Sequence, residues 1–392
     1  MSPSPLARSP DLKRLRDEGY EVRIQSEHLV VSHVPYVNSK REVRFGSLIS
    51  NLNVDTEGVA ATPNTHVVHF DGEHPCTKDG VEIAQIKHQT GHHELAKGLV
   101  SAHSFSCKPP DGYPDYYAKM TRYIEIISAP ARAIDPEATA RTWVPVTEES
   151  ADEGSVLHYV DTATSRAGIV AITEKLKPLK IGIIGLGGTG AYILDLVAKT
   201  PVREIHLFDG DEFLQHNAFR APGAPSLEEL RRKPLKTEYL KELYGRMHKK
   251  IVSHATYVDS SNVEHVLGLD FVFVCIDRGL VKESLYAQME ARGLSFIDVG
   301  MGVSAEGGAL VGVVRTTLST GVKRDHVKRR VPFVDGPDDD YASNIQIAEL
   351  NMLNAALAVL KWKKLYGFYN DVEREHTSLF SINVNQLLSE DK

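Results

Sequence analysis

The chain has 392 residues, of which 42% are hydrophobic and 25% charged, and it carries a net charge of −7. This length suffices for two domains with their own cores, and the composition is typical of a folded globular protein. The negative charge excludes a global basic field, so we do not expect nucleic acid as a partner. The three cysteines lie far apart, which argues against disulfides and for a reducing compartment. Without a signal peptide or a long apolar window, we expect a cytoplasmic protein with no membrane partner.

The first half of the chain predicts an α+β domain over residues 1–148. A short helix is expected at 11–19, a longer one at 113–134, and alternating apolar and polar residues between them indicate half-buried strands. The expected strands are 20–25, 28–34 and 41–46. The segment 135–155, rich in Pro, Thr and acids, is typical of a linker, so the domain boundary is placed near 145–155.

Histidines concentrate in this first half, which holds eight of the seventeen between His33 and His103. The pairs His74/Cys76 and His103/Cys107 would supply four soft ligands, so a structural Zn²⁺ is one hypothesis for this domain. Solvated histidines are a second. A reactive thiol at Cys76 or Cys107 that forms a thioester is a third, because "FDGEHPCTKDG" resembles the H-P-N…G segment of ubiquitin-conjugating enzymes, with Cys76 at the place of the Asn.

The second half, 155–392, alternates short apolar strands with helices and predicts a doubly wound α/β domain with a mainly parallel sheet. Strands are expected at "KIGIIG", "EIHLFD", "HATYV", "DFVFVCID" and "SFIDVG". Helices are expected at about 189–199, 226–246, 261–267 and 279–292, with a last long one at 343–368.

A glycine-rich turn follows the first of these strands. Gly185, Gly187 and Gly190 satisfy G-x-G-x-x-G, and Gly188 adds a further glycine. Such a turn, with the helix that follows, brings backbone N–H groups to a phosphate. Asp209 ends the next strand where an acid would hold a ribose hydroxyl. These features fit NAD and ATP equally well.

The residues beyond that strand separate the two nucleotides. Asp209, Asp211, Asn217 and Arg220 stand at offsets of 0, 2, 8 and 11 in "FDGDEFLQHNAFR". A guanidinium bridges phosphate oxygens, a lysine such as Lys233 or Lys236 suits terminal phosphates, and an acid such as Asp277 at a strand end suits Mg²⁺. No acid–base pair for hydride transfer follows the turn, so an NAD-dependent oxidoreductase is the least favoured functional hypothesis.

In this order the motifs G-x-G-G-x-G, D-x-D-x₅-N-x₂-R, K-x-E and a strand ending C-I-D resemble the ThiF/MoeB/ubiquitin-activating superfamily over about 155–392. The resemblance implies a Rossmann-like domain that binds ATP with Gly185, Gly187, Gly188 and Gly190. It assigns the ribose to Asp209, the phosphates to Arg220 and Lys236, support of the phosphate region to Asn217, and Mg²⁺ to Asp277. The segment between Arg220 and the lysine is longer than usual, so Lys233 could replace Lys236.

The same resemblance implies a homodimer. The segment "TATSRAGIV" matches the family's Ser-Arg helix, whose arginine, here Arg166, reaches the triphosphate from the other subunit in several members. Plainer structural alternatives stay open: Asp211 as a turn acid, Asn217 as a local cap, Lys233 as a solvated cation and Arg166 as a surface arginine.

The activity implied is an adenylyltransferase that activates the C-terminal carboxylate of a ubiquitin-like or sulfur-carrier-like protein. Many members then form a thioester on a cysteine beyond the fifth strand, but no cysteine follows Cys275, which is itself typical of a buried core thiol. The adenylate would therefore pass to another protein's nucleophile or to a thiol of the first half. The alternatives are adenylation of a small-molecule or tRNA-linked carboxylate, and a non-catalytic nucleotide-binding scaffold.

Overall fold

The computed structural model describes residues 5–146, 155–277, 279–333 and 345–392. The chain divides into two compact units, Met1–Ser155 with Tyr159–Gly168, and Val156–His158 with Ile169–Lys392, each with a hydrophobic core. The predicted boundary near 145–155 falls mostly on residues 147–154, which lie outside the described residues.

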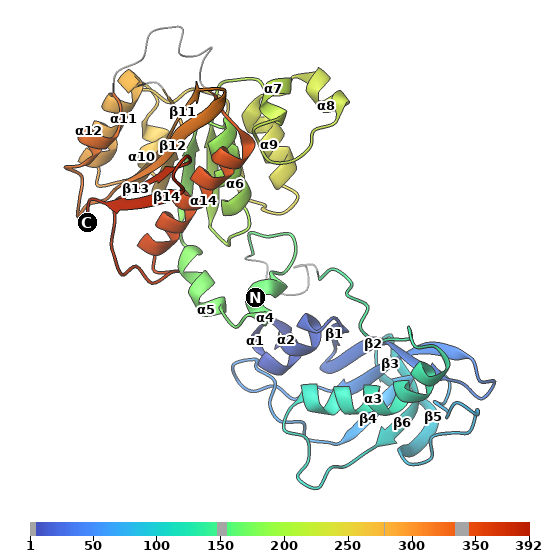
Figure 1. Cartoon of the computed structure of the whole chain (residues 1–392). Helices are drawn as coiled ribbons and strands as arrows, with labels where there is room; N and C mark the ends of the chain where they lie inside the picture. Colours follow the sequence, from blue (N-terminus) through green and yellow to red (C-terminus); the bar gives the residue numbers. More distant parts are fainter. Residues whose placement is uncertain (1–4, 147–154, 278, 334–344) are drawn as a thin grey trace. The chain divides into compact units, whose positions relative to one another are not determined.

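The N-terminal unit is α+β, as predicted. Its six-stranded antiparallel sheet has the order β1-β2-β3-β4-β6-β5, and the long helix α3 packs against it (Figure 1). Helix α3 (Tyr116–Ile134) begins where the Asp115 carboxylate accepts a hydrogen bond from the Ala118 N–H at 2.7 Å, and it buries one apolar stripe in the core. The other elements are α1 (Pro5–Arg8), α2 (Pro10–Asp17), β1 (Glu21–Gln25), β2 (His28–Val37), β3 (Val43–Asn51), β4 (Val67–Asp71), β5 (Lys87–Ala96), β6 (Leu99–Ser106) and α4 (Thr162–Arg166).

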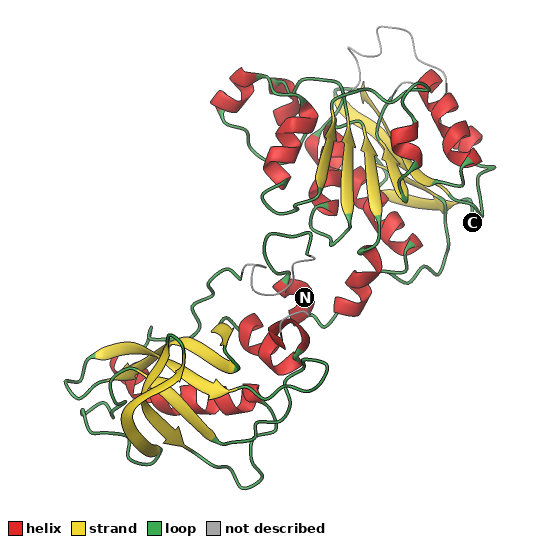
Figure 2. Ribbon diagram, turned by 180° about the vertical axis from the view of Figure 1, so that it is seen from behind, coloured by secondary structure: helices red, strands yellow, loops and turns green. Residues whose placement is uncertain are grey.

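The C-terminal unit is built on an eight-stranded sheet of order β14-β13-β12-β11-β10-β7-β8-β9 (Figure 2). Strands β11, β10, β7, β8 and β9 are parallel, and β12, β13 and β14 continue the sheet in antiparallel pairing. The strands are β7 (Lys180–Ile184), β8 (Glu204–Phe208), β9 (Ile251–His254), β10 (Phe271–Val274), β11 (Ser295–Glu306), β12 (Ala309–Ser319), β13 (Thr377–Ser381) and β14 (Gln386–Glu390).

Helices cover both faces of this sheet, so the doubly wound α/β prediction is confirmed. Residues of α6, α9 and α14 pack in one core cluster, and residues of α11 and α12 pack in another on the opposite face (Figure 1). The helices are α5 (Val170–Thr173), α6 (Gly188–Val197), α7 (Gln215–Ala218), α8 (Leu227–Arg232), α9 (Lys236–Tyr244), α10 (Glu264–Leu267), α11 (Gly279–Ala291), α12 (Val327–Arg330) and α14 (Ala348–Leu365).

The strand order reverses at β7, which defines where a ligand would bind. The chain runs from β7 to β8 and β9 on one side and returns to β10 and β11 on the other. In open α/β sheets a ligand lies beyond the carboxyl ends of the strands at such a reversal. The carboxyl edge of β8, β7 and β10 is therefore the expected binding region.

Three local predictions differ from the structure. The helix expected at 226–246 is two helices, because Lys233 is left-handed (φ 46°) and Pro234 follows it. The strand expected at "HATYV" lies earlier, at Ile251–His254. The strand at "SFIDVG" continues to Glu306 and turns back through Gly307 and Gly308 into β12, because both glycines adopt the positive φ that this turn requires.

Candidate functional site

The glycine-rich turn after β7 needs glycine for identifiable steric reasons. Gly185 has φ +86°, and a Cβ there would lie 2.7 Å from the Cys275 carbonyl oxygen. A Cβ on Gly190 would lie 1.9 Å from the Gly185 carbonyl oxygen. Gly187, the N-cap of α6, has no described atom within 4 Å of its Cβ position. The turn is thus closely packed at Gly185 and Gly190 and open at Gly187. The N-terminus of α6 supplies a partial positive charge that suits phosphate.

The additional glycine, Gly188, makes room for Asn351 of α14. A Cβ on Gly188 would lie 2.1 Å from the Asn351 Nδ2 atom. The Thr189 hydroxyl donates to Asn351 Oδ1 at 2.8 Å, and Asn351 Nδ2 donates to the Arg220 carbonyl oxygen at 3.4 Å. Asn351 therefore joins the turn to the Arg220 segment. Sequence reasoning missed it, although a buried Asn in the apolar stripe of a helix was the available signal.

Asp209, Asp211 and Lys236 form a group at the carboxyl end of β8 that we call the acidic cluster. Asp209 accepts the Leu186 N–H at 2.7 Å and the Asp211 N–H at 2.8 Å, so it holds the glycine turn from the next strand. Lys236 Nζ lies 2.6 Å from Asp211 Oδ2 and 3.7 Å from Asp209 Oδ2, and Lys236 is only 6% exposed. Counted over these three side chains alone, the formal charge is −1.

The structure brings Lys236, and not Lys233, to these acids. Lys236 begins α9, whereas Lys233 is the exposed C-cap of α8. Tyr257 also joins the cluster, because its hydroxyl donates to Asp211 and its ring covers the turn, 2.8 Å from a Cβ position on Gly210. The predicted phosphate lysine therefore has a defined place next to the predicted ribose acid.

Asn217 and Arg220 follow in and after the short helix α7. Asn217 Oδ1 accepts a hydrogen bond from the Leu214 N–H at 2.8 Å. The side chain therefore caps local backbone, as the plainer structural alternative for Asn217 predicts. Its Nδ2 atom is buried without a hydrogen-bond partner among the described residues. Burial, and then the charges of Arg220 and Lys236, lower the pKa of His216.

Asp277 lies three residues beyond the end of β10 and is exposed at the same carboxyl edge. Its neighbours Cys275 and Ile276 touch the glycine turn, since both lie within 3.0 Å of a Cβ on Gly185. An exposed carboxylate at this place has the oxygen donors that Mg²⁺ prefers. Cys275 has a packing role: it also lies 3.4 Å from a Cβ on Gly190, and burial raises the pKa of its thiol.

Arg166 belongs to the N-terminal unit, at the end of α4. Its guanidinium lies 5.6 Å from the centre of the Trp143 ring, in the same unit. This cation–π contact is an ordinary structural role for an arginine. The role at a triphosphate that the resemblance implies for Arg166 stays a prediction.

The zinc hypothesis for the N-terminal unit gains no support from the side-chain geometry and stays a prediction. Among the described residues no three His, Cys, Asp or Glu side chains gather as a metal site, so His74, Cys76, His103 and Cys107 do not form one. The rings of His74 and His103 are in edge contact with centroids 4.9 Å apart, whereas the Cys76 thiol donates to the His74 carbonyl oxygen at 3.3 Å. Cys76 is buried, and burial raises the pKa of its thiol, which disfavours the reactive thiolate.

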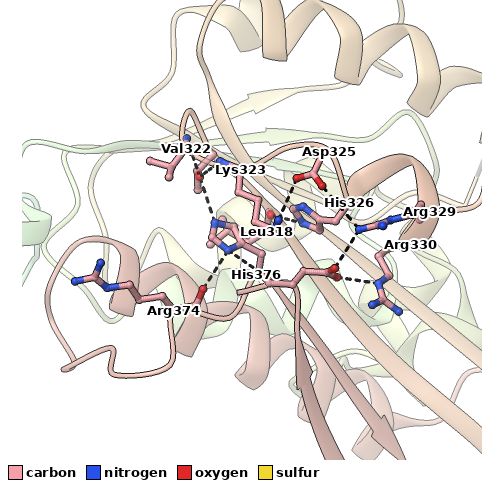
Figure 3. Close-up of polar contacts among 11 residues, drawn as sticks. Leu318, Val322, Lys323, Asp325, His326, Arg329, Arg330, Arg374 and His376 are labelled. Carbon is pink, nitrogen blue, oxygen red and sulfur yellow. Dashed lines mark hydrogen bonds and ion pairs between the residues drawn. The ribbon is translucent and has the colours of Figure 1, made fainter.

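The basic run "VKRDHVKRR" at 322–330 is engaged in contacts within the C-terminal unit (Figure 3). Lys323 lies 3.1 Å from Asp325, and Arg330 Nε donates to Asp391 at 2.8 Å. The Nε2–H of buried His326 donates to the Leu318 carbonyl oxygen at 3.0 Å. These contacts join α12 to β12 and to the C-terminal strand.

Comparisons with known proteins identify the family of this chain. The model of the ThiF family matches residues 162–360. The chain belongs to the ThiF family. Its C-terminal unit is a ThiF-type adenylation domain, and residues 10–162 match a domain of unknown function, DUF6791. Among curated proteins, none matches this chain.

Several solved structures are similar in fold. E. coli MccB with ATP has a TM-score of 0.46 and 18% identity over 59% of this chain and 69% of that chain. The microcin C7 biosynthetic enzyme MccB with N-formylated MccA has a TM-score of 0.48 and 18% identity over 59% and 70% of the two chains. PaaA has a TM-score of 0.44 and 14% identity over 56% and 75%. Within the described residues, no helix has the length and apolar character needed to cross a membrane.

Proposed function

We propose that this protein is an ATP- and Mg²⁺-dependent adenylyltransferase that activates the C-terminal carboxylate of a ubiquitin-like or sulfur-carrier-like protein. The acidic cluster carries the proposal. A buried lysine lies between two carboxylates, one of which holds the open glycine turn, and the Arg220 backbone is joined to that turn through Asn351. This combination suits the ribose and triphosphate of ATP.

In this proposal the phosphates lie over Gly187 and the N-terminus of α6. Asp209 and Asp211 accept hydrogen bonds from ribose hydroxyls, and Lys236 then turns from these acids toward phosphate. Asp277 would hold Mg²⁺, which would supply positive charge to offset that of the pyrophosphate. A carboxylate oxygen attacks the α-phosphorus, the bond from the α-phosphorus to the bridging oxygen breaks, and acyl-AMP and pyrophosphate form. Positioning and charge neutralisation supply the catalysis.

The acyl-adenylate would pass to a nucleophile outside the adenylation domain. Cys275 packs against the glycine turn with a raised pKa, and Cys76 is buried with a raised pKa. Neither environment favours a thiolate nucleophile. We propose that the N-terminal unit, a separately folded domain, recognises the partner protein, and that the protein acts as a homodimer in which Arg166 reaches the partner subunit's nucleotide.

ATP–pyrophosphate exchange tests this proposal. Exchange should require a ubiquitin-like protein with a free C-terminal glycine, and Asp277→Ala should abolish it, whereas Lys233→Ala should leave it within about twofold. Exchange driven by a small carboxylic acid or by charged tRNA would favour those substrates instead. ATP binding without exchange for any carboxylate would favour a scaffold. Elution as a fully active monomer would contradict the homodimer.

A further inference from the structure

A second charged cluster lies on the other side of the glycine turn, in the C-terminal unit. Asp298 of β11 is 0% exposed, and Lys282 Nζ of α11 lies 2.7 Å from its Oδ2 atom. Arg315 of β12 pairs with Asp298 Oδ1, and the Tyr286 hydroxyl donates to Oδ2. We call Asp298, Lys282 and Arg315 the cationic cluster.

This cluster holds one positive charge in excess. Two cations, buried Lys282 and the largely buried Arg315, share one carboxylate, and such an excess is costly unless an anion compensates it. The Nε atom of Arg315 is buried and lacks a hydrogen-bond partner among the described residues, although its side chain is still 12% exposed. Arg315 therefore has a hydrogen-bond donor available at Nε and a positive charge that Asp298 shares with Lys282.

The cluster also lies at the ligand-binding edge. In the parallel pair β10–β11, Val274 is opposite Asp298, so continuing the register places Gly300 level with Ile276, next to Asp277. Arg315 is opposite Gly300, and a Cβ on Gly300 would lie 2.7 Å from the Arg315 Nη2 atom. Because Gly300 has no side chain, the Arg315 guanidinium can lie beside it, two residues beyond Asp298 toward the carboxyl edge. Lys282 lies in the first turn of α11, whose N-terminus adds partial positive charge.

We propose that the cationic cluster is the subsite for the carboxylate that is adenylated, with Arg315 as the residue that binds the C-terminal carboxylate of a peptide. The proposal rests on the adenylation function above and names the recognition of its substrate. The sheet order β12-β11-β10-β7-β8 places the glycine turn of β7 between the two clusters. In the proposed function the phosphates bind to the turn, Lys236 and Arg220. We therefore assign the attacking carboxylate as the anion that Arg315 binds.

The charge balance allows the melting temperature and peptide binding to distinguish this subsite from a purely structural ion pair. Arg315→Met removes the excess charge and leaves the neutral pair of Asp298 and Lys282. If Arg315 only stabilised the fold, its loss would lower the melting temperature. If it is a receptor for an anion, the melting temperature should stay equal or rise while binding is lost.

The experiment measures binding to the full-length protein, without nucleotide, of a short peptide that ends in Gly-Gly, as the free acid and as the C-terminal amide. Titration calorimetry should show that the wild type prefers the acid by about tenfold or more, because charge-assisted hydrogen bonds discriminate by this amount. Arg315→Met should reduce the preference to about onefold without a lower melting temperature. Arg292→Met, which makes the same charge change in an exposed pair with Glu264, should keep it.

Several results would overturn the subsite: equal binding of acid and amide by the wild type, binding of neither, a preserved preference in Arg315→Met, or a loss that comes with a lower melting temperature. The exchange assay is independent of this titration. A selective peptide site without carboxylate-dependent exchange would reject the adenylation function, whereas exchange with a wild-type rate in Arg315→Met would reject the subsite alone.

Discussion

The acidic and the cationic cluster each pair aspartate with lysine, but the third member is a second aspartate in one and an arginine in the other, so their formal charges are opposite. Lys236 lies between Asp209 and Asp211, of which Asp211 is half exposed, whereas Asp298 is fully buried between Lys282 and Arg315. The first leaves a negative charge for hydroxyl groups and cations, and the second leaves a positive charge for an anion. In the proposed account, the two charges would place the nucleotide and the carboxylate on opposite sides of the glycine turn.

The largest effect on stability is expected at Asp298. Asp298→Asn leaves two buried cations without a carboxylate, and breaking a buried pair costs about 3–5 kcal/mol in the free energy of unfolding. Asp211→Asn, in the partly exposed cluster, should cost less than about 1 kcal/mol. Chemical unfolding of both variants measures the difference. Equal losses in the free energy of unfolding would contradict the difference in burial and charge between the two clusters.

Lys236→Met should have the next largest effect, on the rate of exchange. The loss of a cation directed at developing phosphate charge lowers kcat by about 10²–10³-fold. Lys233→Met is the matched control and should change the rate by less than about twofold, because Lys233 is exposed at a helix end. A larger effect for Lys233 than for Lys236 would reverse the assignment of the phosphate lysine.

Substitution in the glycine turn should separate packing from ligand approach. Gly188→Ala places a methyl group against buried Asn351, and we expect a loss of about 1–3 kcal/mol in the free energy of unfolding. Gly187→Ala, at the open position, should keep its stability but weaken ATP binding, because the methyl group occupies the side from which phosphate approaches. Thermal unfolding with and without ATP distinguishes the two. Full ATP affinity in Gly187→Ala would argue against phosphate at this turn.

The smallest effect concerns an ion pair that belongs to neither cluster. Burial raises the pKa of Glu375, but Lys361 and Lys364 outweigh it and lower the pKa from 4.5 to about 2. Because the folded-state pKa is depressed, the pair stabilises the C-terminal unit above pH 4.5, and this stabilisation is lost as the pH falls toward 2. Glu375→Gln should flatten this acid limb of the unfolding curve, and Glu264→Gln, in an exposed pair, should not.

The sequence predicts the parts of the site that are encoded locally. The glycine turn, Asp209, Asp211 and Lys236 lie within about one βαβ unit, where spacing along the chain fixes spacing in space. Asn351 and Arg315 lie more than a hundred residues beyond the glycine turn in the sequence, and a single Asn or Arg carries no local signature. The zinc hypothesis has the same limit, because the two His/Cys spacings are local, whereas a four-ligand site depends on how distant strands pair.

The central claim, that a peptide carboxylate attacks the α-phosphorus of ATP, is tested most directly by following the carboxylate oxygen. The partner's C-terminal carboxylate is labelled with ¹⁸O, and the wild type is incubated with ATP, Mg²⁺ and hydroxylamine, which takes the acyl group as a hydroxamate. The account predicts AMP that carries one ¹⁸O, with pyrophosphate as the other product. AMP without the label, or ADP and phosphate in its place, would contradict it.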